Sequence, residues 1–133
     1  MTTAAPSLTS VETVANRLVN YCRELAFETA MKELYAYDAV SIESVAMPGY
    51  ELETVGRDNI LASSRKWGSE NTVHSITVSE PLISEGVFAV QMSLDVTSQT
   101  FGGQRLNLSE IAVYQVNPEG QITQVNFYYP TGC

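Results

Sequence analysis

The amino-acid sequence predicts an α+β fold in which three N-terminal helices pack on a curved antiparallel sheet. Helical periodicity is found in the first half of the chain, and alternating strand patterns fill the second half. Helices that come first and a strand meander that comes last are typical of this architecture. The chain of 133 residues is expected to form one domain with one core, at residues 10–133, after a short tail at residues 1–9.

Three helices are expected from apolar residues that recur three and four positions apart. The first helix has its apolar positions at Val11, Val14, Ala15, Leu18, Val19, Cys22 and Leu25. The second is short and covers residues 27–35. The third begins after Gly56 and continues to about Trp67, where Gly68 is expected to stop it.

The strands are expected from β-branched runs and from strict alternation of apolar and polar residues. A first strand at residues 40–45 and a return strand at residues 50–55 are joined by the turn Met47-Pro48-Gly49. Longer alternating runs occupy residues 74–78, 88–96, 106–116 and 125–129. Turns that contain glycine or proline separate the last three runs, which therefore form a meander.

The charge distribution argues against several classes of partner. The chain has 15 acidic and 7 basic residues, a formal net charge of −8, and its bases are scattered. Nucleic acids and anionic membranes need clustered bases, so neither is an expected partner. No signal peptide or membrane-spanning run is evident, and Cys22 and Cys133 have neither metal nor redox spacing. We expect a cytoplasmic protein with reduced thiols.

Several short motifs in a fixed order carry a resemblance to a known fold. They are LYAYDAV at residues 34–40, GRDNI at 56–60, EIAVY at 110–114, GQI at 120–122 and FYY at 127–129. Together they resemble the helix-to-strand junction, the third helix and the last two strands of the nuclear transport factor 2-like superfamily, and SnoaL-like proteins in particular. The resemblance covers about residues 10–130. It implies a cone-shaped barrel, a homodimer and a pocket for a small, mostly apolar molecule.

The superfamily includes ketosteroid isomerase, and an ungapped match of the junction places Glu43 at the position of that enzyme's catalytic Asp. The rest of the isomerase site does not match. Val19 falls where the isomerase has an oxyanion Tyr, and Ala112 falls at or near its protonated Asp. Because oxyanion donors usually contribute the largest catalytic effect, the known steroid isomerase mechanism is not expected. The fold itself hosts many activities.

Glu43 has two opposed interpretations. Its apolar neighbours Val40 and Ile42 lie on the other strand face by alternation, which favours a Glu43 side chain in water. The family register instead favours a Glu43 that points into the pocket. There, burial would raise its pKa, and the carboxyl group would serve as a general acid or base.

Glu110 and His74 are the other candidate catalytic residues. Glu110 shares a strand face with Leu106, Leu108, Ala112, Tyr114 and Val116. A carboxylate there is costly unless paired, so it marks a pocket, a structural ion pair with Arg105 or with an Arg of a helix, or an interface contact. His74, the only histidine, shares a face with Ile76 and Val78 and is either a core residue or a proton donor. Glu43, His74 and Glu110 are expected to converge on one cavity if the protein is an enzyme.

Six apolar or aromatic side chains are candidate pocket walls, with ordinary core packing as the alternative. They are Val19, Tyr21, Trp67, Met92, Phe127 and Tyr129. No glycine-rich phosphate loop, catalytic Ser-His-Asp motif or CxxC is present, so neither a cofactor nor a metal is expected. The expected function is small-molecule binding, with cofactor-free isomerase, dehydratase, cyclase or hydrolase chemistry. The alternative is a non-catalytic binding or interaction module of the same fold.

Overall fold

The sheet and helices occupy residues 8–129, the part of the chain that the computed structural model describes. The expected tail lies mostly outside these residues, as does Cys133, and the first helix begins at Leu8. In chain order the elements are α1 (Leu8–Arg23), α2 (Phe27–Leu34), β1 (Tyr35–Glu43), β2 (Glu53–Val55), α3 (Arg57–Glu70), β3 (Asn71–Val78), β4 (Leu82–Ser84), β5 (Val87–Ser98), the 3-10 helix η1 (Gln99–Phe101), β6 (Gln104–Val116) and β7 (Ile122–Tyr128).

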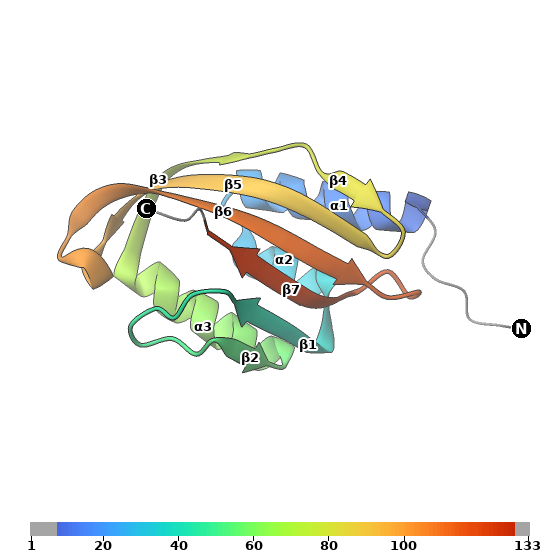
Figure 1. The fold of residues 1–133 in the computed structure, drawn as a ribbon, viewed down its shortest axis with the longest axis horizontal. Coiled ribbons are helices and arrows are strands. Elements are labelled where there is room, and N and C mark those ends of the chain that lie inside the picture. The colour runs from blue at the N-terminus through green and yellow to red at the C-terminus, as the bar shows by residue number, and fades with distance from the viewer. Residues whose placement is uncertain (1–7, 130–133) are drawn as a thin grey trace, which may run out of the picture.

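The predicted α+β fold, with helices on one face of a curved sheet, is confirmed (Figure 1). The seven described strands form one sheet in the order β2-β1-β7-β6-β5-β3, and β4 pairs with β5 at one end. The sheet is mixed, because β1 and β7 run parallel while all its other pairs are antiparallel. Since β1 and β7 are far apart in sequence, this parallel pair does not follow from local hairpin signals.

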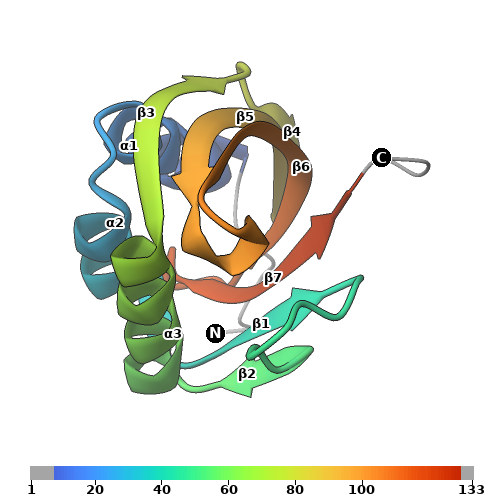
Figure 2. The same ribbon diagram turned by 90° about the vertical axis from the view of Figure 1, so that its left-hand side faces the viewer.

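The sheet curls around a central space without closing (Figure 2). Helix α3 lies across the gap between the two edges of the sheet and contacts β1, β2 and β3. Helices α1 and α2 lie beside each other, and α1 packs against β3, β4 and β5. The helices therefore complete the wall that the open sheet leaves unfinished.

The hydrophobic core fills one part of this space. Alternate residues of β5 and β6 point inward and meet the apolar face of α1. Phe88 and Tyr114 stack there, with ring centroids 4.7 Å apart and planes 12° from parallel. Further along the same inward faces, Met92 and Glu110 border open space. One continuous strand face thus supplies both the core and a cavity.

Two predicted helix boundaries were wrong. Helix α1 ends at Arg23, because Leu25 adopts a left-handed conformation with φ of 60° and is 41% exposed. The amide of Ala26 donates to the carbonyl of Tyr21 and that of Leu25 to Cys22, the hydrogen-bond pattern of a Schellman cap. Gly68 does not stop α3, which continues to Glu70. Glycine commonly ends a helix by taking the left-handed conformation, which Gly68 does not adopt.

Candidate active site

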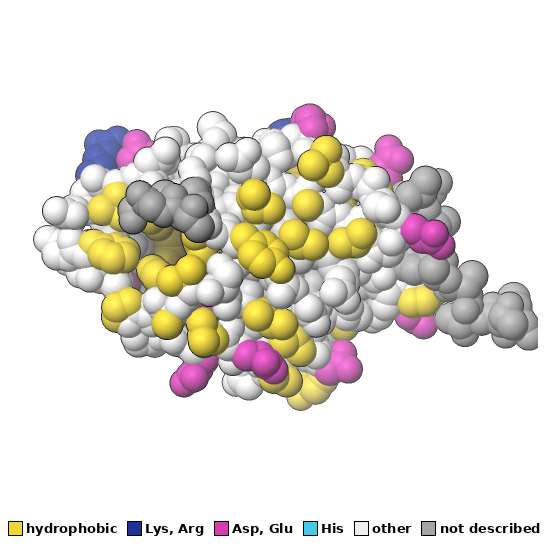
Figure 3. Space-filling model, in the orientation of Figure 1, with side chains coloured by type: hydrophobic (Ala, Val, Ile, Leu, Met, Phe, Trp, Pro, Cys, Tyr) yellow, Lys and Arg dark blue, Asp and Glu magenta, His cyan; other side chains and the backbone are white. Residues whose placement is uncertain are grey.

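A cavity of about 640 Å³ opens on the concave side of the sheet. Its volume falls within the range of about 300–1,000 Å³ that is usual for small-molecule sites. Most of its lining is apolar, and Figure 3 shows a hollow with hydrophobic side chains toward the end of the molecule that carries the β5–β6 turn. Among the described residues that line it, none is a Lys, Arg or His.

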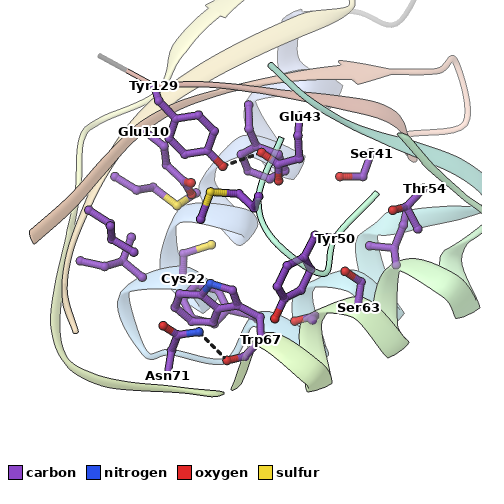
Figure 4. A pocket seen from close by; sticks show the side chains of 18 of the residues that line it. Cys22, Ser41, Glu43, Tyr50, Thr54, Ser63, Trp67, Asn71, Glu110 and Tyr129 are labelled. Atoms are coloured by element: carbon purple, nitrogen blue, oxygen red, sulfur yellow. Dashed lines mark hydrogen bonds between the residues drawn. The ribbon is translucent and has the colours of Figure 1, made fainter. Parts of the chain in front are cut away.

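Two carboxyl groups and one phenol meet in this cavity (Figure 4). Glu43 is the last residue of β1, Glu110 lies in the middle of β6, and Tyr129 directly follows β7. Because β7 pairs with β1 on one side and β6 on the other, Tyr129 lies between the two carboxyl groups. The Tyr129 hydroxyl donates a hydrogen bond of 2.5 Å to Oε2 of Glu43.

The two carboxyl groups have different environments. The pKa of Glu110 is raised to about 7, first by burial and then by the negative charge of Glu43, while the nearby Tyr129 hydroxyl acts in the opposite direction. Burial also raises the pKa of Glu43, and the Tyr129 hydrogen bond again opposes the shift. The pair titrates as a coupled unit, in which Glu110 is the group that keeps a proton near neutral pH.

The orientation of Glu43 agrees with the family register and disagrees with the alternation argument. Ser41 and Glu43 both line the cavity, whereas Val40 and Ile42 lie on the opposite, convex face of β1. Alternation misleads here because it assumes that the apolar face is the inner one. In β1 the inner face borders a cavity with polar groups, and the outer face carries the branched apolar side chains.

His74 does not join the carboxyl groups. The pairing of β3 with β5 shifts by one residue between Val73 and Ser75, which breaks the simple alternation that placed His74 beside Ile76 and Val78. The His74 side chain is exposed, outside the cavity, and its Nε2 lies 2.7 Å from Oγ1 of Thr97. The expected convergence of three titratable groups is therefore corrected to Glu43 and Glu110.

Four of the six candidate wall residues line the cavity: Trp67, Met92, Phe127 and Tyr129. Val19 and Tyr21 do not, because α1 faces the cavity with Leu18 and Cys22, which are four residues apart on one side of the helix. Val19 is buried in the core. The Tyr21 hydroxyl lies outside and donates to Glu33 over 3.0 Å.

Glu110 does not form the structural ion pair with Arg105 that was one alternative to a pocket. That guanidinium instead forms two hydrogen bonds with Asp95, at 2.9 and 2.8 Å, on the surface of the sheet. Among the described residues that line the cavity, no Lys, Arg or His lies beside Glu110 to offset the burial that raises its pKa.

Several further polar side chains in the cavity were not identified from the sequence. Three of them, Cys22, Tyr35 and Tyr114, carry titratable groups with shifted pKa values. Burial raises the pKa of the Cys22 thiol to about 12 and also raises the pKa values of both tyrosines, so all three stay uncharged at neutral pH. Each lies among apolar residues in the periodic pattern of its helix or strand, so the sequence pattern does not distinguish it from an ordinary core residue.

The segment between β1 and β2 forms one side of the cavity. Met47 and Tyr50 of this segment are among the lining residues. The Tyr50 hydroxyl is hydrogen-bonded to Glu70 of α3, and Lys66 contacts both the carbonyl of Gly49 and the Tyr50 ring, 4.4 Å from its centroid. These contacts fasten the segment to α3.

Within residues 8–129, no group of three or more His, Cys, Asp or Glu side chains is arranged to hold a metal ion. In the same part of the chain, no helix is long and apolar enough to cross a membrane. The arrangement that is present can move protons, because it joins a carboxylate, a neutral carboxylic acid and a phenol in one apolar cavity.

Comparison with known families agrees with this architecture. A model of the SnoaL-like domain matches residues 8–129. The chain belongs to the SnoaL-like family. A comparison with curated proteins finds no significant match.

Three solved structures share the fold. A candidate SnoaL-like polyketide cyclase, also described as a carbohydrate phosphatase, from Mesorhizobium loti is 27% identical, with a TM-score of 0.80 over 88% of this chain and 97% of that one. A candidate isomerase from Bacillus subtilis is 16% identical, with a TM-score of 0.70 over 98% of this chain and 90% of that one. A candidate SnoaL-like polyketide cyclase from Jannaschia sp. CCS1 is 13% identical, with a TM-score of 0.69 over 90% and 85% of the two chains.

Glu110→Gln is expected to remove a pH-dependent loss of stability. Between the usual carboxyl pKa of 4.5 and about 7, the folded protein keeps the Glu110 proton while the unfolded chain releases it. Rising pH therefore favours the unfolded state across this window, by at most about 3 kcal/mol in the free energy of unfolding. Urea unfolding from about pH 5 to pH 8 should show the variant becoming progressively more stable relative to wild type.

The matched control is Glu119→Gln, which changes an exposed carboxyl group in the turn between β6 and β7. Its free energy of unfolding should change with pH by the same amount as that of wild type over the same pH range. If the free energy of unfolding of Glu110→Gln also changed with pH by the same amount as that of wild type, the assignment of a desolvated, protonated Glu110 would be wrong.

Proposed function

We propose that the protein is a cofactor-free acid–base enzyme that acts on a small, mostly apolar and uncharged molecule. The observation that carries the proposal is the pairing of Glu43 and Glu110 across Tyr129 inside the cavity. Catalytic acids and bases are commonly found as two titratable groups whose environments separate their pKa values. Here Glu110 is the more desolvated member, so the base is Glu43 and the acid is Glu110.

Each residue has one role in the proposed proton transfer. Glu43 removes a proton from a carbon next to a substrate carbonyl group. Glu110 donates its proton, or a hydrogen bond, to the oxygen that becomes negative as the C–H bond breaks. The Tyr129 hydroxyl holds the Glu43 carboxylate in place. When Glu43 returns its proton to another carbon and Glu110 recovers its own, the protons balance and no co-reactant is required.

The walls of the cavity set the substrate class. Side chains such as Trp67, Met92, Leu94 and Phe127 favour an apolar body. An anionic substrate would face Glu43 and Glu110, and none of the described lining residues is a Lys, Arg or His that could balance its charge. The second description of the Mesorhizobium loti protein suggests a phosphate ester as substrate. Such an ester is negatively charged and therefore does not suit this cavity. Isomerisation, dehydration, cyclisation and hydrolysis of an uncharged carbonyl compound remain within the proposal.

We also propose a homodimer formed through the convex face of the sheet. Ile111 and Tyr128 are neighbours across β6 and β7 on this face and are 49% and 47% exposed. Ile42 of β1 belongs to the same face, and Figure 3 shows hydrophobic side chains gathered across it. An exposed apolar face of this kind can pair with its own copy about a twofold axis.

A cytoplasmic location completes the proposal. Cys22 is a free, buried thiol, which suits a reducing compartment. The net charge of −8 and the scattered bases leave nucleic acid and anionic membrane as unsuitable partners.

Glu43→Gln is expected to abolish catalysis of proton exchange while leaving the fold intact. β-Tetralone, an uncharged aromatic ketone, serves as a probe, and NMR in D₂O follows the loss of its exchangeable C–H protons. Wild type should accelerate the exchange over buffer, and the variant should lose about 10²–10⁴-fold of that rate, as is typical when a general base is removed.

Glu51→Gln is the control, because Glu51 also borders the cavity but lies at an exposed position. This variant should retain the wild-type rate. If wild type exchanged the probe no faster than Glu43→Gln, catalysis by Glu43 would be refuted and the non-catalytic binding module would become the better account.

The double substitution of Ile111 and Tyr128 by Glu is expected to convert the dimer into a monomer. Light scattering after gel filtration should give twice the chain mass of 14.6 kDa for wild type and the single-chain mass for the variant. Leu25→Glu, placed on the helical side of the molecule, should stay dimeric. A monomeric wild type at micromolar concentration would rule out this interface.

A further inference from the structure

The cavity contains a buried hydroxyl group that the proposed chemistry does not use. Ser98 ends the inward-facing series of β5, in which every earlier member from Phe88 to Val96 is apolar. It is 1% exposed, lines the cavity, and its Oγ has no hydrogen-bond partner among the described residues. A buried hydroxyl without a partner destabilises a fold by about 1–3 kcal/mol, so its presence at this position calls for an explanation.

Asn71 lies directly opposite Ser98 in the pairing of β3 with β5. It is 8% exposed and lines the same cavity. Its Nδ2 donates to the carbonyl of Trp67 over 2.9 Å. Since that carbonyl can only accept, the orientation of the amide is fixed, and Oδ1 is the acceptor that remains.

This second pair of polar groups is well separated from the carboxyl groups. In Figure 4, Asn71 and Trp67 lie on the opposite side of the cavity from Glu43, Glu110 and Tyr129, and Cys22 lies between the two sides. Along β5, Ser98 is six residues beyond Met92, which pairs with Glu110. A strand of that length covers about 20 Å, and the curvature of the sheet makes the direct distance across the cavity shorter.

We propose that Ser98 and Asn71 form a second polar subsite, which binds a hydroxyl group at the far end of an elongated, uncharged substrate. A ligand hydroxyl accepts from the Ser98 hydroxyl and donates to Oδ1 of Asn71, so it satisfies both groups at once. A carbonyl oxygen leaves Oδ1 without a donor. A carboxylate or phosphate places a negative charge against that same acceptor, and the described lining residues include no Lys, Arg or His to balance it. The substrate class is therefore an apolar body with an oxygen at the carboxyl pair and a hydroxyl at the other end.

The inference rests on the proposed function in one respect, since it takes the first oxygen of the ligand to lie at Glu43 and Glu110. It concerns binding alone and is tested without turnover. If the wild-type protein did not catalyse proton exchange but still bound the probes as predicted below, the catalytic role of Glu43 would be refuted and the subsite would not. If it catalysed exchange but did not bind the probes as predicted, only the subsite would be refuted.

Two pairs of rigid probes test the subsite by isothermal titration calorimetry. Each pair compares a single phenol with its diol: p-hydroxybiphenyl with p,p′-biphenol, and p-hydroxystilbene with p,p′-dihydroxystilbene. The two lengths allow for the curvature of the sheet. At least one diol should bind wild type about 3–10-fold more tightly than its single phenol, the gain expected of one satisfied hydrogen-bonding group.

Ser98→Ala should abolish the preference for the diol and leave the affinity for the single phenol within about twofold of wild type. Ser41→Ala is the matched control, because Ser41 lines the cavity on the Glu43 side and away from Asn71. It should retain the preference. The proposal is overturned if Ser98→Ala weakens phenol and diol equally, if neither diol exceeds its phenol, or if no probe binds saturably.

A second measurement needs no ligand and separates a binding role from a structural one. If the Ser98 hydroxyl is reserved for a ligand, Ser98→Ala removes an unpaired buried group, and the folding equilibrium constant of the free protein stays within about threefold of wild type or increases. A decrease of fivefold or more in urea unfolding would show that the hydroxyl holds a structural partner such as a buried water, and would contradict the proposal.

Discussion

The arrangement around Tyr129 is the constraint on which the site depends. Placing two carboxyl groups in one apolar cavity is unfavourable, because burial and mutual repulsion both oppose ionisation. The protein meets this constraint by different means at the two positions. Glu43 accepts the Tyr129 hydrogen bond and borders solvent more closely, whereas Glu110 is desolvated and keeps a proton. The same asymmetry that limits the energetic cost also divides the roles of base and acid.

The fold produces this arrangement through strand order. The parallel pairing of β1 with β7 brings Glu43 beside the end of β7, and the antiparallel pairing of β7 with β6 brings Glu110 to its other side. The packed side chains around Phe88 and Tyr114 hold the strands rigidly on the core side. The cavity begins beyond this packed part of the inward faces of β5 and β6. Helix α3 and the segment between β1 and β2, which Lys66 and Tyr50 fasten to it, supply the remaining wall. A functional site on the continuation of a rigid core face is well placed for precise geometry.

The sequence was informative where local periodicity and global fold agree. The three helices and the alternation of β5 and β6 follow from apolar spacing, and Glu110 was recognisable as a carboxylate on an apolar face. Periodicity was misleading where the backbone departs from regularity. The irregular pairing at Val73 and Ser75 moved His74 to the surface, and a left-handed Leu25 ended α1 early. Glu43 could be oriented only through the family resemblance, because its strand carries apolar side chains on the outside. Ser98 gave no signal at all, since a small polar residue at the end of a strand is ordinary until its burial is known.

The central claim is that Glu110 holds a proton near neutral pH while Glu43 is the ionised partner. Titration of the side-chain carboxyl carbons by NMR, with Glu43→Gln and Glu110→Gln used to assign the two signals, measures this directly. The account predicts a midpoint of about 7 for Glu110, and for Glu43 a midpoint below that of Glu110 but above the usual value of 4.5. Midpoints near 4.5 for both residues would contradict it, because two carboxyl groups that ionise as they do in water cannot divide the roles of acid and base.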